Sequence, residues 1–272
     1  MGAMRAAART GRRGRAAVPF LVAVLAAAGA SIFMVPLIAM VWRTPWHLSW
    51  HELTAPEAFT ALRLSLLCSV SATLVSVVFG LPLAWVQARA HFRGRALLRA
   101  LTMLPIILPP VVGGVALLLA FGRRGLAGQW LYALLGIQLP FTTAGAVLAE
   151  TFVAMPFFVQ TLEGGLRSMD RRLEDAAHTL GASRWRVFTR VTLPLVRPSL
   201  QAGAILCWAR ALGEFGATIT FAGNFPGRTQ TLPLAVYLTL ETRPEAAMVL
   251  SLLLLGVSLA VLVALRHRLD VL

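Results

Sequence analysis

The chain has 272 residues, of which 58% are hydrophobic, and its mean hydropathy of +0.75 is typical of a membrane protein. The formal net charge is +14, but all 25 basic residues are arginines set mainly between long apolar runs, which argues against a nucleic-acid partner. The sequence has no lysine, which excludes a P-loop, because the lysine of that motif contacts the nucleotide phosphates.

Residues 1–57 are expected to form a basic cytoplasmic tail, a first membrane-spanning helix and an outer loop. Five arginines lie within the first 17 residues, and an apolar run follows from Ala16 to Trp42. Ala28-Gly29-Ala30 could imitate the cleavage site of a secretory signal peptide. The run continues well past this point and is long enough to cross a bilayer, which favours an uncleaved helix.

Five further apolar runs are near or above the roughly 20 residues that a membrane-spanning helix needs. These runs are Leu62–Val86, Leu97–Phe121, Phe141–Leu162, Leu200–Ala222 and Ala246–Leu265. Together with the first run, they predict an all-α, polytopic membrane protein with six transmembrane helices. Both ends of such a chain lie on the same side of the membrane.

The distribution of arginine gives the orientation. If the N-terminus is cytoplasmic, the cytoplasmic segments contain 18 arginines and the outer loops contain five. Cytoplasmic loops of membrane proteins carry an excess of basic residues. We therefore expect both termini to be cytoplasmic.

The predicted third span begins with a cluster of prolines. Pro105, Pro109 and Pro110 lie within six residues, and Gly113 follows them. Proline has no amide hydrogen and clashes with the preceding turn, so the helix must kink or break here. A broken helix is tolerated in a bilayer where its free backbone groups find partners or line a cavity. Pro109, Pro110 and Gly113 are therefore expected either to line a translocation pathway or to form a kinked packing helix.

A polar interval, residues 169–198, separates the fourth and fifth spans and contains nine charged residues. Its pattern predicts two short helices joined by a turn. Asp170 is the predicted N-cap of the first helix, and Gly181 is expected to take a positive φ in the turn. Ser183 is the predicted N-cap of the second helix, which Pro194 is expected to end. The second helix has one apolar and one basic face. We therefore expect the helical hairpin formed by residues 169–198 to dock on a partner.

The hairpin resembles the EAA loop of ABC importer permeases, although an ordinary amphipathic loop is the alternative. The shared pattern is Asp175-Ala176-Ala177, three residues, Gly181, nine residues, and Val191-Thr192-Leu193-Pro194. Aspartate stands where the family has glutamate, although a glutamate precedes it, and valine stands for isoleucine. In that family the loop docks into a groove of the ATP-hydrolysing subunit. The resemblance implies an ATPase-coupling role for Glu174, Asp175, Ala176, Ala177, Gly181, Trp185, Val191, Leu193 and Pro194.

The predicted fifth span contains two ionisable residues, Arg210 and Glu214. Charged groups inside a membrane are costly and usually functional. The two residues are four apart and can neutralise each other on one helix face. Gly213 and Gly216 are expected to make the helix thin at this level, and Thr218 could donate a hydrogen bond to a passing oxyanion. This group either belongs to the translocation pathway or is a buried ion pair that only fixes helix packing.

The same region resembles permeases for molybdate and related tetrahedral oxyanions. The similarity extends from Arg210 to Asn224 and on through Pro226-Gly227-Arg228-Thr229-Gln230-Thr231-Leu232-Pro233. It covers most of the chain and implies a type I importer permease domain over residues 58–265, followed by a cytoplasmic tail, 266–272. Sulfate, tungstate or another substrate of ABC importers is the alternative.

The resemblance also implies the partners. It predicts a homodimer of this subunit in the cytoplasmic membrane of a prokaryote, surrounded by lipid. Two ATPase subunits and an external oxyanion-binding protein would complete the transporter. ATP and Mg²⁺ would bind to the ATPase subunits, and this chain is expected to be no enzyme and to bind no cofactor.

Two functions of different classes are the alternatives. An intramembrane enzyme is disfavoured because His51-Glu52 begins a zinc-protease pattern, yet Ala55 stands where the second histidine ligand belongs. Cys68 and Cys207 lie in separate apolar runs, so neither a metal site nor a disulfide framework is expected. A passive channel explains the spans but not the spacing of the coupling loop.

Overall fold

The computed structural model describes residues 19–269, and all regular structure within them is helical. The chain divides into two units, Met1–Thr44 and Pro45–Leu272. The first unit contains α1 (Phe20–Arg43), an apolar helix with no residue buried within the chain. The predicted basic tail and the first residues of the predicted first span, 16–18, lie outside the described residues.

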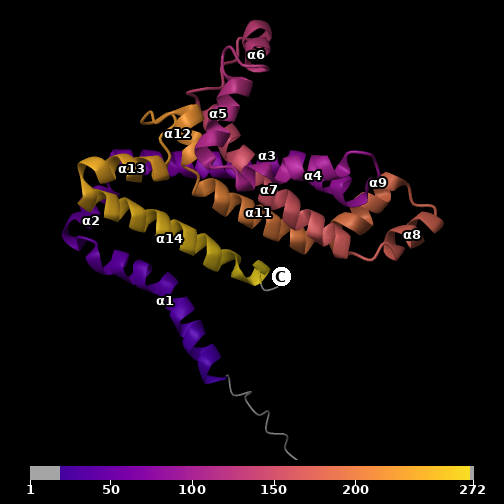
Figure 1. Cartoon of the computed structure of the whole chain (residues 1–272), viewed down its shortest axis with the longest axis horizontal. Coiled ribbons are helices and arrows are strands. Elements are labelled where there is room, and N and C mark those ends of the chain that lie inside the picture. The colour runs from indigo at the N-terminus through magenta and orange to yellow at the C-terminus, as the bar shows by residue number, and fades with distance from the viewer. Residues whose placement is uncertain (1–18, 270–272) are drawn as a thin grey trace, which may run out of the picture. The chain divides into compact units, whose positions relative to one another are not determined.

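The second unit is a series of helices of very different lengths (Figure 1). Its elements are α2 (Trp46–Leu53), α3 (Pro56–Arg89), α4 (Arg95–Ile107), α5 (Pro110–Phe121), α6 (Gly128–Leu135), α7 (Thr143–Ser168), α8 (Arg172–Thr179), α9 (Arg184–Val187), the π-helix η1 (Phe188–Thr192), α10 (Leu193–Leu195), α11 (Arg197–Leu212), α12 (Gly216–Ala222), α13 (Leu232–Thr242) and α14 (Pro244–Leu269).

Four of the described helices are long and apolar enough to cross a membrane: α1, α3, α7 and α14. The predicted third span is broken into α4 and α5, as its prolines indicated. The prediction of a continuous fifth span is wrong, because α11 ends at Leu212 and α12 begins only at Gly216. The region expected to be the last outer loop contains α13, a short apolar helix.

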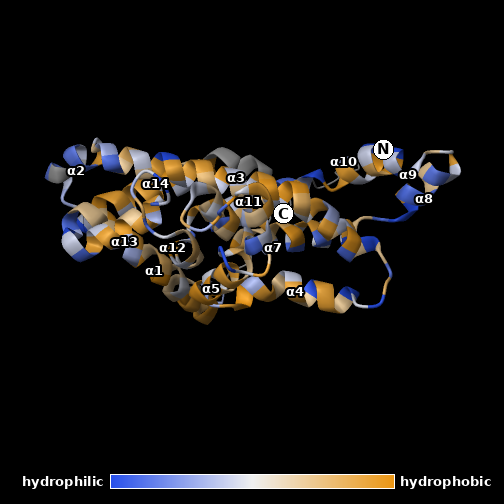
Figure 2. Cartoon of the chain, turned by 90° about the horizontal axis from the view of Figure 1, so that it is seen from above, coloured by the Kyte–Doolittle hydropathy of each residue, from blue (hydrophilic) through white to orange (hydrophobic). Residues whose placement is uncertain are grey.

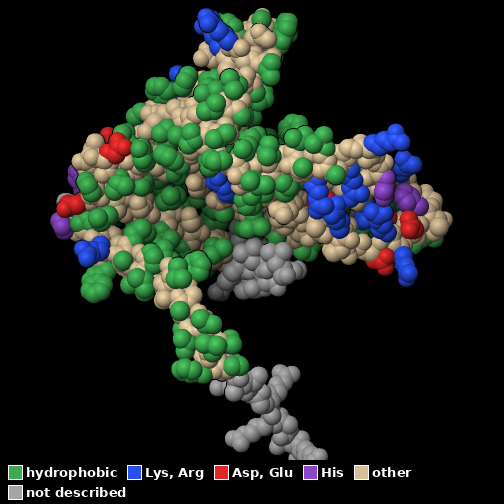
Figure 3. Space-filling view, viewed as in Figure 1, with side chains coloured by type: hydrophobic (Ala, Val, Ile, Leu, Met, Phe, Trp, Pro, Cys, Tyr) green, Lys and Arg blue, Asp and Glu red, His purple; other side chains and the backbone are tan. Residues whose placement is uncertain are grey.

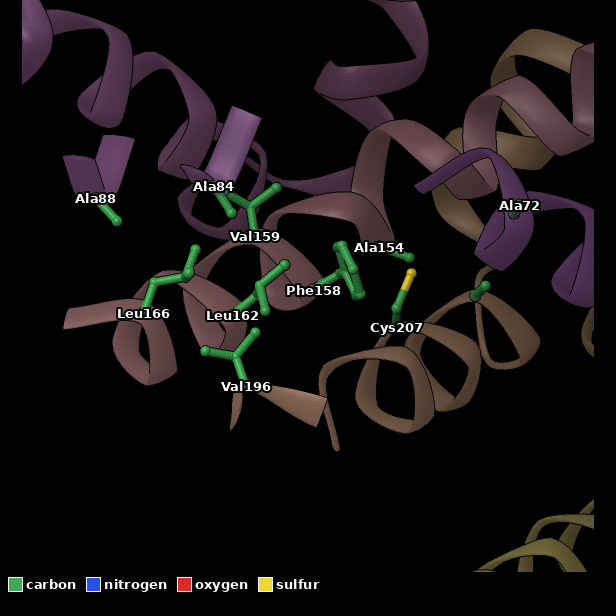
Figure 4. Packing of buried hydrophobic residues seen from close by; sticks show 11 residues of the cluster. Ala72, Ala84, Ala88, Ala154, Phe158, Val159, Leu162, Leu166, Val196 and Cys207 are labelled. Atoms are coloured by element: carbon green, nitrogen blue, oxygen red, sulfur yellow. The ribbon is translucent and has the colours of Figure 1, made fainter. Parts of the chain in front are cut away.

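The centre of the second unit is formed by α3, α7 and α11, which pack against one another. Figure 4 shows the buried cluster between them, in which alanines of α3 and α7 surround larger side chains of α7. Small residues allow helix backbones to approach closely, which is how helices associate in a bilayer where lipid is as apolar as the side chains. Phe158 is fully buried at this position, with its ring against Gly80 of α3 and Gly203 of α11.

One end of the bundle differs in polarity from the rest. The long helices are largely hydrophobic, whereas α8 and the segments beside it are hydrophilic (Figure 2). Basic side chains gather at this end, over the region of α8 and α9 (Figure 3). The membrane-length helices therefore lead into a polar structure built by residues 169–198, which we call the hairpin.

The packing around Phe158 generates a stability prediction. Phe158→Ala should leave a cavity between α3, α7 and α11 and lower the thermal midpoint of the purified protein in detergent. Burial from water contributes little within a membrane, so the loss should lie at the lower end of the roughly 3–5 kcal/mol seen for soluble cores. Phe79→Ala is the matched control, since that ring is 63% exposed on α3. Equal midpoints for the two variants would contradict this account of the core.

Candidate functional site

The hairpin forms two helical segments joined by a tight turn, as the sequence predicts. Asp170 Oδ1 accepts a hydrogen bond from the Arg172 amide at 3.0 Å at the start of α8. Gly181 has a φ of 83°, a conformation that a side chain would strain. The hydroxyl of Ser183 accepts a hydrogen bond from the Arg186 amide at 3.4 Å and so caps α9. The predictions for Gly181 and Ser183 are therefore confirmed, whereas the N-cap position of α8 is occupied by Arg171, and Asp170 lies one residue before it.

The expected end of the second helix is wrong. Pro194 does not end it, because α9, η1 and α10 form one continuous helical run that lasts until Leu195. The missing amide hydrogen of proline would normally break an α-helical ladder. Here the run changes to π-helical bonding over Phe188–Thr192, immediately before the proline. Such a turn inserts an extra residue and alters which carbonyls need partners, so Pro194 is accommodated.

The nine residues of the EAA-like pattern do not share one environment. Asp175, Ala176, Gly181, Trp185 and Pro194 are exposed. Ala177, Val191 and Leu193 are half-buried. Glu174 faces the body of the protein, and its side chain is only 16% exposed. The pattern therefore includes an outer surface and one residue with an internal role.

Glu174 holds the hairpin to the end of α3. Its Oε2 atom lies 3.2 Å from Arg89 Nη2, and its Oε1 atom accepts a hydrogen bond from Thr192 Oγ1 at 2.6 Å. The Arg89 side chain is 9% exposed and Thr192 is 1% exposed, so water screens these contacts weakly. One carboxylate thus connects α8, η1 and α3. We call Arg89, Glu174 and Thr192 the clasp.

A second carboxylate ties α4 to α7 near the same end. Glu163 is 1% exposed and lies 3.3 Å from Arg99 Nε and 2.7 Å from Arg167 Nη2. Sequence reasoning counted these two arginines only as topology signals and missed their shared buried partner, Glu163. The sequence signal that could have identified Glu163 is its position near the end of an apolar run, next to a basic loop.

The break in the fifth span is held together by Glu214. Its Oε2 atom lies 2.6 Å from Arg210 Nη2, so the predicted ion pair is present. Its Oε1 atom accepts a hydrogen bond from the Ala217 amide at 2.8 Å, which satisfies a free amide at the start of α12. Glu214 is 1% exposed, whereas the Arg210 side chain is 28% exposed. Gly213 is exposed within the break, and Gly213 and Gly216 do not thin a continuous helix as expected.

The two broken spans contact each other. Gly216 at the start of α12 packs on α5, and a Cβ at this position would lie 2.8 Å from Pro110 Cβ. Pro110, like Pro109, is otherwise exposed. Gly113 is buried against the ring of Phe152 of α7, and Thr218 is fully buried. The predicted pathway residues therefore divide into a group at the breaks that is exposed (Pro109, Pro110 and Gly213) or partly exposed (Arg210), and a packed group behind it (Gly113, Glu214, Gly216 and Thr218).

Glu150 is an ionisable residue that sequence reasoning missed. It lies on α7, is 1% exposed, and has no basic side chain within ion-pair distance among the described residues. An acidic residue within a predicted membrane span was the signal that could have identified it. In the part of the chain that the structure describes, no three His, Cys, Asp or Glu side chains lie close enough to hold a metal ion.

The clasp generates a prediction about the hairpin. Glu174→Gln can still accept the hydrogen bond from Thr192, but it loses the ion pair with Arg89. Both Glu174→Gln and Arg89→Gln should therefore accelerate hydrogen exchange of the amides of residues 172–195, as measured by mass spectrometry. A double-mutant cycle should give a coupling energy of about 0.5–3 kcal/mol. Asp175→Asn is the matched control, an adjacent exposed acid that has no ion pair with any residue in the described range 19–269. Identical exchange in Glu174→Gln and Asp175→Asn would mean that the clasp does not restrain the hairpin.

Comparison with known proteins shows the family to which the chain is similar. Residues 76–269 match the family model described as "Binding-protein-dependent transport system inner membrane component". The chain is 47% identical to the molybdenum transport system permease protein ModB of Mycobacterium tuberculosis, over 89% of this chain and 92% of that protein. It is 38% identical to the sulfate transport system permease protein CysT of Escherichia coli, over 82% of each chain.

A solved structure shows the same fold. The crystal structure of a bacterial ABC transporter involved in the import of the acidic polysaccharide alginate has a TM-score of 0.70 to this chain. The match covers 91% of this chain and 93% of that chain at 19% identity, so the likeness concerns the fold alone. The family model spans well over half of the sequence, and the ModB similarity spans nearly all of it. The chain therefore belongs to the family of inner membrane components of binding-protein-dependent transport systems, as a multi-pass permease subunit of an ABC importer and not its ATPase.

Proposed function

We propose that this chain carries molybdate, a tetrahedral oxyanion, across the bacterial inner membrane as the permease of an ATP-driven importer. The observation that carries the proposal is the 47% identity to molybdenum permeases over 89% of the chain. The similarity to a sulfate permease is lower, at 38%, which makes sulfate the second candidate. Both substrates are tetrahedral dianions, so the two candidates share one chemistry. An intramembrane enzyme and a passive channel are not supported by the family membership.

The hairpin is the proposed contact with the ATPase. Its outer surface includes Asp175, Ala176 and Trp185, which are exposed. Its clasp joins that surface to α3, and its continuous helical run joins it through Leu195 to α11. Movement imposed on α8 by ATP-driven closure of the partner would therefore reach the membrane helices directly. Glu174 acts in this scheme as a positioning residue rather than as a docking residue.

The two broken spans are the proposed translocation pathway. Arg210 offers a partly exposed guanidinium beside the break, and guanidinium groups bind oxyanions through paired hydrogen bonds. Its pairing with Glu214 would keep the site from holding a dianion tightly, which suits transit rather than storage. We also propose six membrane segments with cytoplasmic termini and a homodimer as the working unit. The arginine distribution supports the orientation, and the relatives support the permease role.

The proposal is tested by uptake. Bacteria that lack their own molybdate importer should take up labelled molybdate when this chain is expressed with its ATPase and binding-protein partners. Excess tungstate should compete, and sulfate should compete less. The control replaces the P-loop lysine of the ATPase partner, because a passive channel would still conduct after that change. Uptake of sulfate in preference to molybdate would overturn the substrate assignment.

The role of Arg210 is tested separately. Arg210→Gln and Glu214→Gln should each destabilise the protein, since breaking a buried pair leaves an uncompensated charge that costs on the order of 3–5 kcal/mol when fully buried. The partial exposure of Arg210 places the expected loss for Glu214→Gln below that range. The double variant should regain stability. A pathway role predicts that this stable double variant assembles with the ATPase but does not transport, whereas normal uptake would reduce the pair to a structural contact.

A further inference from the structure

An open apolar groove lies where the hairpin meets α3. It has a volume of about 570 Å³ and is lined by Leu81, Pro82, Trp85, Arg184, Trp185 and Phe188. The first three residues belong to α3, and the others belong to α9 and η1. The wall is therefore made by a membrane-spanning helix on one side and by the hairpin on the other. Neither the clasp nor the proposed pathway uses the groove, and Trp185 is the one residue that it shares with the proposed ATPase contact.

Three aromatic rings fix the shape of the groove. The rings of Trp185 and Phe188 are stacked with centroids 5.8 Å apart. Trp85 meets Phe188 edge to face at 6.5 Å. The indoles of Trp85 and Trp185 are nevertheless 39% and 73% exposed. Rings that pack on each other in this way form a preformed surface with little side-chain entropy left to lose on binding.

The groove also lies at a defined level of the membrane. Leu81 and Pro82 fall within the apolar run of α3, and the helix ends at Arg89, four residues beyond Trp85. Tryptophan is enriched at the boundary between the hydrocarbon core and water. The apolar end of the groove therefore faces hydrocarbon, and its other end faces the headgroup region on the hairpin side. This placement rests on the proposed cytoplasmic position of the hairpin.

The headgroup end carries charged side chains of both signs. A polar recess of about 300 Å³ adjoins the groove and shares Trp85, Arg184 and Phe188 with it. The recess also contains Arg89, Glu174, Asp175 and His178. Arg89 is occupied by Glu174, whereas Arg184 has no carboxylate within ion-pair distance among the described residues. Arg184 lines both the apolar and the polar space, so its guanidinium can meet an anionic group at their junction.

These observations indicate which class of ligand fits the groove. An extended peptide would need backbone hydrogen-bond partners in a membrane, and the aromatic and aliphatic side chains of the groove offer few. An acyl chain needs none, and a phosphate complements Arg184. We propose that the groove binds an anionic phospholipid of the inner leaflet, with an acyl chain against Trp85 and Phe188 and its phosphate on Arg184. The lipid contacts α3 and the hairpin together, so it stiffens the joint between them.

The test uses the complete transporter, permease with its ATPase partner, in nanodiscs of phosphatidylcholine with or without phosphatidylglycerol. Lipids that remain after extraction into detergent are measured by native mass spectrometry. The wild type should retain phosphatidylglycerol in preference to phosphatidylcholine. Arg184→Gln should reduce that preference roughly fivefold, the effect of one basic residue at an anionic membrane surface. Leu81→Trp, which fills the groove, should abolish retention of both lipids.

Arg186→Gln is the matched control, because it removes an exposed arginine of the same helix that does not line the groove. It should behave like the wild type. Thermal midpoints measured in detergent verify that every variant is folded. Equal retention by wild type, Arg184→Gln and Leu81→Trp overturns the site, and equal retention of both lipids by the wild type overturns the anionic headgroup. Either result with normal molybdate uptake would contradict the lipid site alone, whereas failed uptake with selective lipid retention would contradict the proposed transport function alone.

Discussion

A backbone that leaves its helical hydrogen bonds inside a bilayer must find other partners, and this constraint governs the membrane part of the chain. The chain meets it in two ways at its two breaks. Proline removes an amide donor at the first break, so fewer groups need satisfying. At the second break, the carboxylate of Glu214 accepts a hydrogen bond from the Ala217 amide, and Arg210 compensates the negative charge of Glu214. The breaks then pack on each other through Gly216 and Pro110, and each stabilises the other's departure from helical geometry.

Carboxylates perform a similar task at the hairpin end. Glu163 and Glu174 each pair with one arginine of another helix, Arg99 of α4 and Arg89 of α3, and so connect segments at a polar boundary that hydrophobic packing alone would not hold. The hairpin has two connections to the membrane helices. One is a side-chain contact to α3, and the other is the unbroken backbone that runs from α9 to the start of α11. A force applied to α8 therefore has both a lateral and an axial route into the bundle.

Much of this architecture could be predicted from the sequence, for identifiable reasons. Apolar length located the membrane segments, and Gly181 and Ser183 specified the turn of the hairpin through local backbone chemistry. The break after Leu212 could not be predicted, because Gly213 is tolerated in membrane helices and the decisive contact joins Glu214 to an amide three residues later. The clasp was missed because Arg89 and Glu174 are far apart in sequence and meet only when α8 folds back on α3. Pro194 was misjudged because the π-helical bonding before it left no pattern that the sequence reasoning used.

The short π-helix has a geometric consequence for the whole hairpin. Each residue turns an α-helix by about 100°, so an extra residue accommodated in one turn rotates everything before it relative to everything after it. The direction in which α8 and α9 face, viewed along α11, is therefore encoded by the number of residues between Phe188 and Thr192. A relative with one residue fewer in this π-helix would turn a different face of the hairpin outward, even if all other side chains of the loop were the same. If the hairpin is the ATPase contact, as proposed, the number of residues in this π-helix sets the angle at which the permease meets the ATPase.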